Sequence, residues 1–164
     1  HTTEEKLQSL PDIQPVSNHD LKRMASGYGW RIDPVYGVSK FHAGMDFTAP
    51  KGTEIYATGK GKVIKVNYSS GGYGKRVIID HGYGYKTLYA HMSGFAVKQG
   101  EEVQRGQVIG YVGNTGKSVG PHLHYEVHKN GEKVNPVYFY YQDLDDSSFE
   151  EMIRLSENTG SSLD

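Results

Sequence analysis

Glycine is the feature that most restricts what this chain can fold into. Twenty of its 21 glycines lie between Gly27 and Gly131, and Gly160 is the exception. A glycine inside a helix costs roughly 1 kcal/mol relative to alanine, so a mostly helical bundle is disfavoured. Thirteen Tyr, five Phe and one Trp supply the apolar bulk that disordered chains lack. We therefore expect a turn-dense block of short strands, carried between two arms that are nearly free of glycine.

The Gly-rich block contains β-prone runs separated by turn residues. They predict strands at residues 54–57, 62–68, 76–80, 86–91, 108–112 and 122–128. The arms favour helix: one from Thr2 that Pro11 ends, a helical turn over 17–24, and one from 145 or 146 to 158, where Ser147 and Glu150 have capping-box spacing. The expected division is a helical N-terminal arm at 1–26, one β domain at 27–140, and an acidic C-terminal helix and tail at 141–164.

Charge is distributed unevenly along the chain. Residues 27–140 carry 14 Lys/Arg and 8 Asp/Glu, a net of +6, whereas residues 141–164 carry 1 and 7, a net of −6. The basic block suggests an anionic partner. Nucleic acid is not expected, because the chain has no dense Lys/Arg run and no nucleic-acid-binding motif. We also expect no membrane contact within this segment, because no apolar run approaches the roughly 20 residues that span a bilayer. The polar start at His1 suggests that a targeting or anchor segment is absent from the chain.

Histidines and carboxylates form the pattern that points to chemistry. His42 and Asp46 lie four residues apart around Gly44. Downstream, the segment 122–128 alternates strictly between polar and apolar residues. Alternate side chains of a strand share a face, so His122, His124, Glu126 and His128 should point one way, while Leu123, Tyr125 and Val127 point into the core.

Two histidines and one carboxylate are the protein ligands of a catalytic zinc site that keeps one position open. His42, Asp46 and His124 supply this set, and the absence of Cys argues against a four-ligand structural site. A non-haem Fe(II) site uses the same residue types, but its usual His-x-carboxylate spacing does not match the spacing here. Bound zinc lowers the pKa of water and polarises carbonyls. His122 lies about 6.6 Å from His124 along the strand and suits proton transfer, with His91 as second and Glu126 as third candidate.

Three motifs make the chain resemble the lysostaphin/LytM-type zinc metallopeptidases over roughly residues 24–137. They are Gly29-Trp30-Arg31-Ile32-Asp33-Pro34 leading to His42-Ala43-Gly44-Met45-Asp46-Phe47; Thr87-Leu88-Tyr89-Ala90-His91-Met92; and Gly113-Asn114-Thr115-Gly116 through Gly120-Pro121-His122-Leu123-His124-Tyr125-Glu126. The resemblance implies one zinc per chain, held by His42, Asp46 and His124. It implies catalytic roles for His91 and His122, without settling which acts as the general base.

The resemblance also implies a fold. We expect a mainly β, antiparallel domain of barrel-sandwich-hybrid type with a metal groove, flanked by short N- and C-terminal helices. Tyr36 and Asn114 are candidates for contacts with substrate in that groove.

The activity implied is that of a zinc-dependent metalloendopeptidase that hydrolyses peptide cross-links or stem peptides of bacterial peptidoglycan through a metal-activated water. It would act in the cell envelope or periplasm, within a larger parent chain or envelope complex. One alternative is a non-catalytic wall-binding or amidase-activating module, although such relatives lose zinc ligands and none of the five positions is lost here. A biotinyl- or lipoyl-type carrier is disfavoured, because no Lys occupies the expected turn. A Gly–Gly bridge, a D-Ala–diaminopimelate link and a D-Ala–Lys link all remain open as the cleaved bond.

Overall fold

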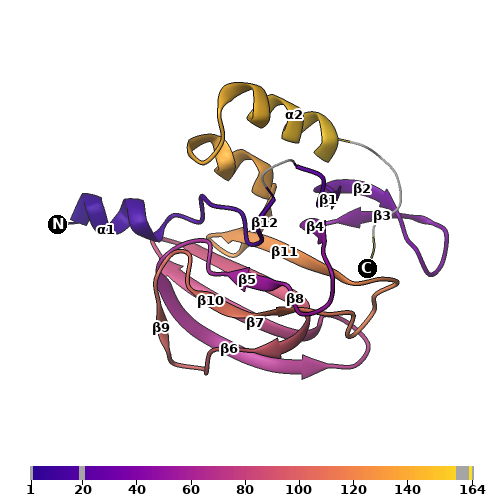
Figure 1. The fold of residues 1–164 in the computed structure, drawn as a ribbon, viewed down its shortest axis with the longest axis horizontal. Helices are drawn as coiled ribbons and strands as arrows, with labels where there is room; N and C mark the ends of the chain where they lie inside the picture. Colours follow the sequence, from indigo (N-terminus) through magenta and orange to yellow (C-terminus); the bar gives the residue numbers. More distant parts are fainter. Residues whose placement is uncertain (1, 19–20, 158–162, 164) are drawn as a thin grey trace.

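The computed structural model describes residues 2–18, 21–157 and 163, and within them the chain is mainly antiparallel β (Figure 1). Seven strands form the path of the main sheet: β1 (Met24–Ser26), β4 (Met45–Thr48), β11 (His122–Lys129), β8 (Tyr85–Phe95), β7 (Gly74–Gly82), β6 (Gly61–Ser69) and β9 (Glu102–Val103). β10 (Val108–Val112) pairs with β5 (Glu54–Tyr56) and β8, and β12 (Glu132–Val134) pairs with β11. β2 (Gly29–Ile32) and β3 (Ser39–His42) form a separate two-stranded sheet. The expected fold class is confirmed.

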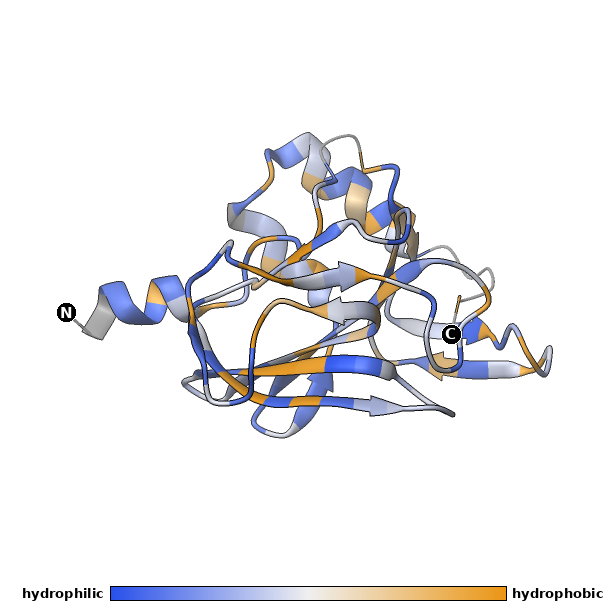
Figure 2. Cartoon of the chain, turned by 60° about the horizontal axis from the view of Figure 1, so that its bottom comes forward, coloured by the Kyte–Doolittle hydropathy of each residue, from blue (hydrophilic) through white to orange (hydrophobic). Residues whose placement is uncertain are grey.

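Apolar and polar residues are both found along the strands, as the hydropathy colouring in Figure 2 shows. In β11 the expected alternation is confirmed, because Leu123, Tyr125 and Val127 are fully buried in the core. The opposite face of β11 is buried as well, since His122, His124 and Glu126 are each at most 3 % exposed. A strand with polar groups buried on one face must satisfy them internally, and this face of β11 holds the candidate site.

β11 lies between β4 and β8 in the main sheet, and its register decides which side chains meet. His124 is the Cα partner of Asp46 on β4 and of Ala90 on β8. His91 follows Ala90 directly, so three segments that are far apart in the sequence place their histidines and carboxylates together at this point. Because neighbouring strands lie about 4.8 Å apart, side chains on the same face at this register are within contact distance.

The helices lie outside the main sheet (Figure 1). They are α1 (Thr2–Ser9), the 3₁₀ helix η1 (Pro136–Gln142) and α2 (Asp146–Ser156). Asp145 caps α2 by accepting a hydrogen bond from the Ser148 amide at 2.7 Å, so the cap is Asp145 and not the predicted Ser147. The helical turn expected over 17–24 is absent from the described part of that range, because Met24 begins β1 and pairs with Phe47. Neither α-helix in the described chain is long and apolar enough to cross a bilayer.

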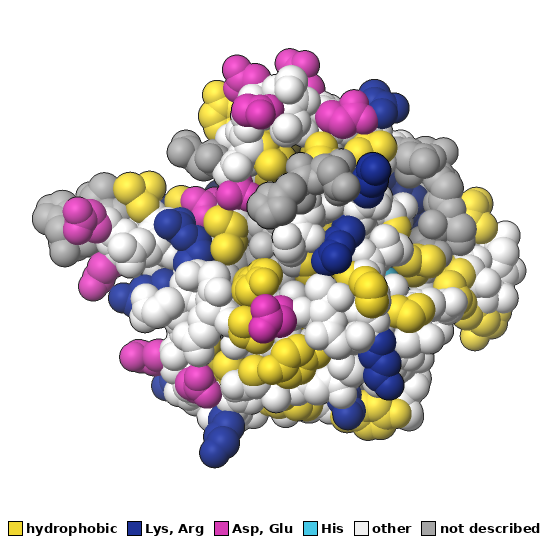
Figure 3. Space-filling model, viewed as in Figure 1, with side chains coloured by type: hydrophobic (Ala, Val, Ile, Leu, Met, Phe, Trp, Pro, Cys, Tyr) yellow, Lys and Arg dark blue, Asp and Glu magenta, His cyan; other side chains and the backbone are white. Residues whose placement is uncertain are grey.

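The acidic helix α2 attaches to the sheet through apolar contact. Its Met152 is fully buried in the core, while the Asp and Glu side chains gather at the top of Figure 3, over α2. Arg31, on β2, donates from Nη2 to the carbonyl of Ser156 and so ties the end of α2 to the small sheet. The position of α2 is therefore set by burial and by this one buried hydrogen bond.

Candidate metal centre

Three of the predicted site residues come together where β3, β4 and β11 meet. His42 ends β3, Asp46 lies on β4, and His124 lies opposite Asp46 on β11. Gly44 makes the approach of these strands feasible. A Cβ atom at this position would overlap the carbonyl of Tyr125 and the ring of His124. Only glycine therefore lets the chain turn from His42 to Asp46 while it packs directly against β11.

The three ligand atoms form a nearly equilateral triangle. His42 Nε2 lies 3.2 Å from Asp46 Oδ1 and 3.2 Å from His124 Nδ1, and His124 Nδ1 lies 3.1 Å from Asp46 Oδ1. A tetrahedral zinc ion with bonds of 2.0–2.1 Å places its ligand atoms about 3.3 Å apart. The spacing of these donors therefore fits three corners of a tetrahedral site, with the fourth corner left for water or substrate.

Outer hydrogen bonds fix the tautomer of both candidate ligand histidines. His42 Nδ1 donates to the carbonyl of Gly27 at 2.9 Å, which leaves the lone pair of the neutral ring on Nε2. His124 Nε2 donates to the carboxylate of Glu126 at 2.7 Å, which leaves its lone pair on Nδ1. In these tautomers two nitrogen lone pairs and a carboxylate oxygen face one point. A shared cation fits this set of donor atoms.

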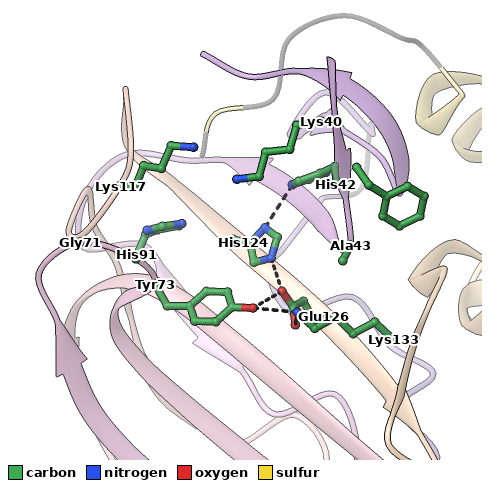
Figure 4. Close-up of a pocket in the computed structure, with 12 residues that line it drawn as sticks. Lys40, His42, Ala43, Gly71, Tyr73, His91, Lys117, His124, Glu126 and Lys133 are labelled. Carbon is green, nitrogen blue, oxygen red and sulfur yellow. Dashed lines mark hydrogen bonds and ion pairs between the residues drawn. The ribbon is translucent and has the colours of Figure 1, made fainter. Parts of the chain in front are cut away.

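Glu126 is buried and contacts His124 on the side of its ring that faces away from His42 (Figure 4). Besides His124, its carboxylate accepts from Tyr73 Oη at 2.8 Å and from His128 Nε2 at 2.8 Å, and Lys133 Nζ lies 3.5 Å away. Burial alone would raise the pKa of this carboxyl, but the hydrogen bonds from His124 and His128 together with Lys133 hold the pKa far below its usual range. Glu126 therefore stays ionised and orients His124. The sequence pattern had offered Glu126 as the third candidate for proton transfer.

His91 and His122 lie beside the three ligand residues. Their ring centroids are 4.7 Å apart, and His122 Nε2 is 3.8 Å from Asp46 Oδ1. His91 Nδ1 donates to the carbonyl of Thr115 at 2.6 Å, and His122 Nδ1 donates to that of Gly120 at 2.8 Å. Each ring in its neutral form therefore keeps its lone pair on Nε2. His91 has a backbone φ of +60°, a conformation that is rare for residues other than Gly and that clusters at functional sites.

A cavity of about 320 Å³ opens in front of His42, His91 and His124. Figure 4 shows its lining side chains converging from both walls, and His122 is not among the lining residues. Sequence reasoning missed most of the residues that line it, because they are common types in glycine-rich or exposed segments: Lys40, Phe41, Ala43, Gly71, Gly72, Tyr73, Lys117 and Lys133.

The two groove residues suggested by the sequence lie near the cavity without lining it. Tyr36 occupies the tip of the β2–β3 hairpin and is 75 % exposed, with Lys117 Nζ 5.6 Å from its ring centroid. Asn114 lies in the loop 113–121, where its side-chain oxygen accepts from the Ser118 hydroxyl. Asp33 links the loop 113–121 to β3, because its carboxylate accepts from Lys117 Nζ at 2.6 Å and also lies 3.7 Å from Lys40 Nζ.

Comparison with known proteins identifies the family. The profile of Peptidase family M23 matches residues 40–136, which contain all five histidine and aspartate positions discussed above. The chain belongs to peptidase family M23. It is 49 % identical over 115 residues to the DD-carboxypeptidase/endopeptidase Mpg of Neisseria meningitidis, which covers 70 % of this chain and 26 % of that protein. It is 45 % identical over 118 residues to the peptidoglycan DD-endopeptidase ShyC of Vibrio cholerae, covering 71 % and 27 %.

Solved M23 structures share the fold. A zinc-containing peptidase from Vibrio cholerae superposes with a TM-score of 0.65 at 37 % identity, covering 76 % of this chain and 38 % of that one. The catalytic domain of lysostaphin from Staphylococcus simulans superposes with a TM-score of 0.63 at 32 % identity, covering 76 % and 98 %. This M23 chain spans about a quarter of the length of the curated relatives it matches. The resemblance seen in the three sequence motifs is thereby confirmed.

Proposed function

We propose that this chain is the catalytic part of a zinc-dependent endopeptidase that hydrolyses peptide cross-links of bacterial peptidoglycan. The observation that carries the proposal is the triangle of His42 Nε2, Asp46 Oδ1 and His124 Nδ1, with sides of 3.1 to 3.2 Å. Both histidines are held by outer hydrogen bonds in the tautomer that a metal ligand needs. A non-catalytic module of the same fold would have no use for this arrangement.

Zinc held by His42, Asp46 and His124 would supply Lewis acidity and lower the pKa of a bound water. The other residues of the site are placed for proton handling. His91 and His122 each donate from Nδ1 to a backbone carbonyl, so the neutral form of each ring has its basic nitrogen at Nε2. We assign the contact with substrate to His91, because it lines the cavity. His122 is fully buried beside Asp46 and is assigned to stabilising charge at the ligand cluster.

The proposed substrate is a direct cross-link between two stem peptides that contain D-amino acids. One relative, from Neisseria meningitidis, is named a DD-carboxypeptidase/endopeptidase, and another, from Vibrio cholerae, is named a peptidoglycan DD-endopeptidase. Independently, three lysines, Lys40, Lys117 and Lys133, are among the residues that line the cavity. Stem peptides with free carboxylates complement such a lining, whereas a glycine bridge has no charge to offer it. A D-Ala–diaminopimelate bond is therefore favoured over Gly–Gly.

The same proposal implies where the protein acts and what it belongs to. Peptidoglycan lies outside the cytoplasm, so we propose action in the cell envelope or periplasm. Residues 27–140 would form the catalytic domain, with β1 added to its sheet from the preceding segment. The chain covers only 26–27 % of the Neisseria and Vibrio relatives. We propose that it works as part of a larger protein or envelope complex.

The test is metal analysis together with digestion of a purified cross-linked muropeptide dimer, whose fragments are identified by mass. We expect about one zinc per chain, and loss of hydrolysis in His124→Ala and His122→Ala. His81→Gln, which removes a histidine remote from the site, is the matched control. A protein that cannot be loaded with zinc would overturn the proposal. A zinc-loaded protein that binds sacculi without cleaving them would favour the non-catalytic module.

A further inference from the structure

A second cavity, of about 420 Å³, opens on the same face of the main sheet as the candidate metal centre. His128 lines it, and because alternate side chains of a strand share a face, His128 points to the same side of β11 as His124 and Glu126. Glu126 lines the first cavity, and its carboxylate accepts the hydrogen bond from His128 Nε2 at 2.8 Å. The two cavities are therefore neighbours, with the Glu126–His128 pair between them.

Side chains that can carry charge form a row across the floor of this second cavity. His128 on β11 is the Cα partner of Lys86 on β8, and Lys86 is the Cα partner of Asp80 on β7. All three residues line the cavity. Residues directly opposite in an antiparallel pair share a face, with Cβ atoms about 5 Å apart, and opposite charges there commonly pair with each other. Among the described residues, however, no ion pair joins Lys86 to Asp80. Asp80 accepts instead from the Gly82 amide at 2.9 Å, and Lys86 is exposed.

Two turns form the rim of this cavity at the end remote from the candidate metal centre. Gly84 lies in the turn between β7 and β8, and Asn130 lies in the turn between β11 and β12. The Asn130 amide donates to the carbonyl of Gly84 at 2.7 Å. Gly84 has a φ of +86°, and a Cβ atom there would overlap Asn130 Oδ1, so only glycine allows the two turns to meet. The rim is therefore held by direct contact between the turns.

The position and the charges of the row limit what it can bind. His128 is four residues beyond His124, so the row lies about 13 Å along β11 from the candidate metal centre. An extended peptide covers about the same distance in four residues, or in fewer residues and one long side chain. A matching ligand carries an ammonium for Asp80 and a carboxylate for Lys86. The free end of a diaminopimelate side chain bears both groups on one carbon, whereas a lysine side chain offers the ammonium alone.

We propose that the cavity lined by Asp80, Lys86 and His128 is a distal subsite that binds the free amino-acid end of a diaminopimelate side chain of the substrate. In this subsite Asp80 accepts from the ammonium and Lys86 donates to the carboxylate. The subsite therefore distinguishes stem peptides that contain diaminopimelate from those that contain lysine. The inference rests on the proposed function, because its ligand is a peptidoglycan stem peptide. It adds the recognition of a stem residue at a distance from the bond that is cleaved.

The test measures the binding of two stem tetrapeptides without a cross-link, which differ only in having diaminopimelate or lysine as their third residue. Dissociation constants are measured by calorimetry at low salt for the wild type, Lys86→Gln and Asp80→Asn. Lys98→Gln is the matched control, because Lys98 is exposed and lines neither cavity. The amide resonances of Gly84 and Gly131, which line the second cavity, are followed by NMR to locate the contact.

We expect Lys86→Gln to weaken binding of the diaminopimelate peptide by about three- to tenfold, between the effect of an exposed ion pair and that of a hydrogen bond to a charged group. The lysine peptide should change by less than about twofold in the same variant, because it has no carboxylate for Lys86. Asp80→Asn should weaken the binding of both peptides, and Lys98→Gln that of neither. Thermal melting confirms that the variants are folded.

Equal losses for the two peptides in Lys86→Gln would overturn the subsite, since they would indicate a general attraction between charges. Unchanged Gly84 and Gly131 resonances on binding would overturn it as well. Because the tetrapeptides have no cross-link to cleave, this result is independent of hydrolysis. A protein that cleaves the muropeptide dimer without the expected binding pattern would refute the subsite alone. One that shows the pattern without cleaving the dimer would support the subsite and refute the proposed endopeptidase.

Discussion

Glu126→Gln tests the claim that a buried carboxylate orients the proposed metal ligand His124. Glu126 is 1 % exposed, and its two oxygens accept from His124 at 2.7 Å, Tyr73 at 2.8 Å and His128 at 2.8 Å. Glutamine has nearly the same shape but carries one acceptor oxygen and no charge. Its NH₂ group would face a donor at a position where the carboxylate now accepts. The substitution therefore removes the charge that raises the basicity of His124 while it leaves the three proposed ligands in place.

The expected magnitude follows from the position of Glu126 behind His124. Removing a carboxylate that supports a metal-ligating histidine costs 10- to 100-fold in metal affinity or activity, which corresponds to about 1.4 to 2.7 kcal/mol. We place Glu126→Gln toward the upper end of that range, because the substitution also removes the negative charge that lies 3.5 Å from Lys133 Nζ. Affinity is measured by competition for zinc with a chromophoric chelator, and kcat/KM is measured at saturating zinc.

Glu132→Gln is the matched control, since this residue lies on the neighbouring strand β12 and is exposed. It should leave zinc affinity unchanged. The reasoning would be refuted if Glu126→Gln bound zinc within twofold of the wild type while remaining folded. His124 would then keep its orientation without the Glu126 carboxylate, and the charge of Glu126 would not act on zinc affinity.

Three further results are expected. Gly44→Ala should lose at least 2 kcal/mol of unfolding free energy in urea and most of its zinc, because its Cβ overlaps β11, whereas Gly71→Ala, with open space around it, should lose little. Burial lowers the pKa of His81 to about 4 despite hydrogen bonds that favour its charged form, so the unfolded chain binds a proton at this residue before the folded chain does. The free energy of unfolding should therefore fall by up to about 3 kcal/mol between pH 6.5 and pH 4. If urea titrations of His81→Gln gave the same dependence of unfolding free energy on pH, this explanation would be contradicted. Tyr89→Phe removes a buried hydroxyl that contacts Thr58 and Thr87 and should cost about 1–3 kcal/mol in thermal melting without loss of zinc, whereas the exposed Tyr68→Phe should be neutral.

Local pattern predicted much of the main sheet. The run expected at 108–112 coincides with β10, and those at 62–68, 76–80 and 122–128 lie inside β6, β7 and β11. These strands combine β-branched or alternating residues with glycine turns, so a single stretch of sequence carries the signal. The strand expected to end at His91 instead continues to Phe95 as β8. His91 has a positive φ, and the register with β7 shifts beside it, so a local irregularity was interpreted as an end.

The residues of the candidate site also divide into those that a local sequence motif predicts and those that only the packing of the fold brings together. His42, Asp46 and His124 were identifiable because their residue types are rare together and their motifs are specific. The role of Glu126 was not, because its burial depends on Tyr73 and Lys133, which lie 53 residues before it and 7 residues after it. The contact of Leu163 with Asp46 joins positions 117 residues apart. Such pairings are set by the packing of the whole fold, and no local period encodes them.

The location of β11 inside the main sheet has a consequence for how this protein loses or changes its activity. His122 and His124 are carried by a strand hydrogen-bonded on both sides, so they cannot come apart by local fraying. Heat should therefore displace His122 and His124 only when the whole sheet unfolds. The β2–β3 hairpin is a separate two-stranded sheet whose exposed side chains stand at the rim of the cavity. Selectivity among the proposed peptide substrates can thus be altered at exposed positions of the hairpin other than His42, while Asp46, His122 and His124 stay anchored in the main sheet.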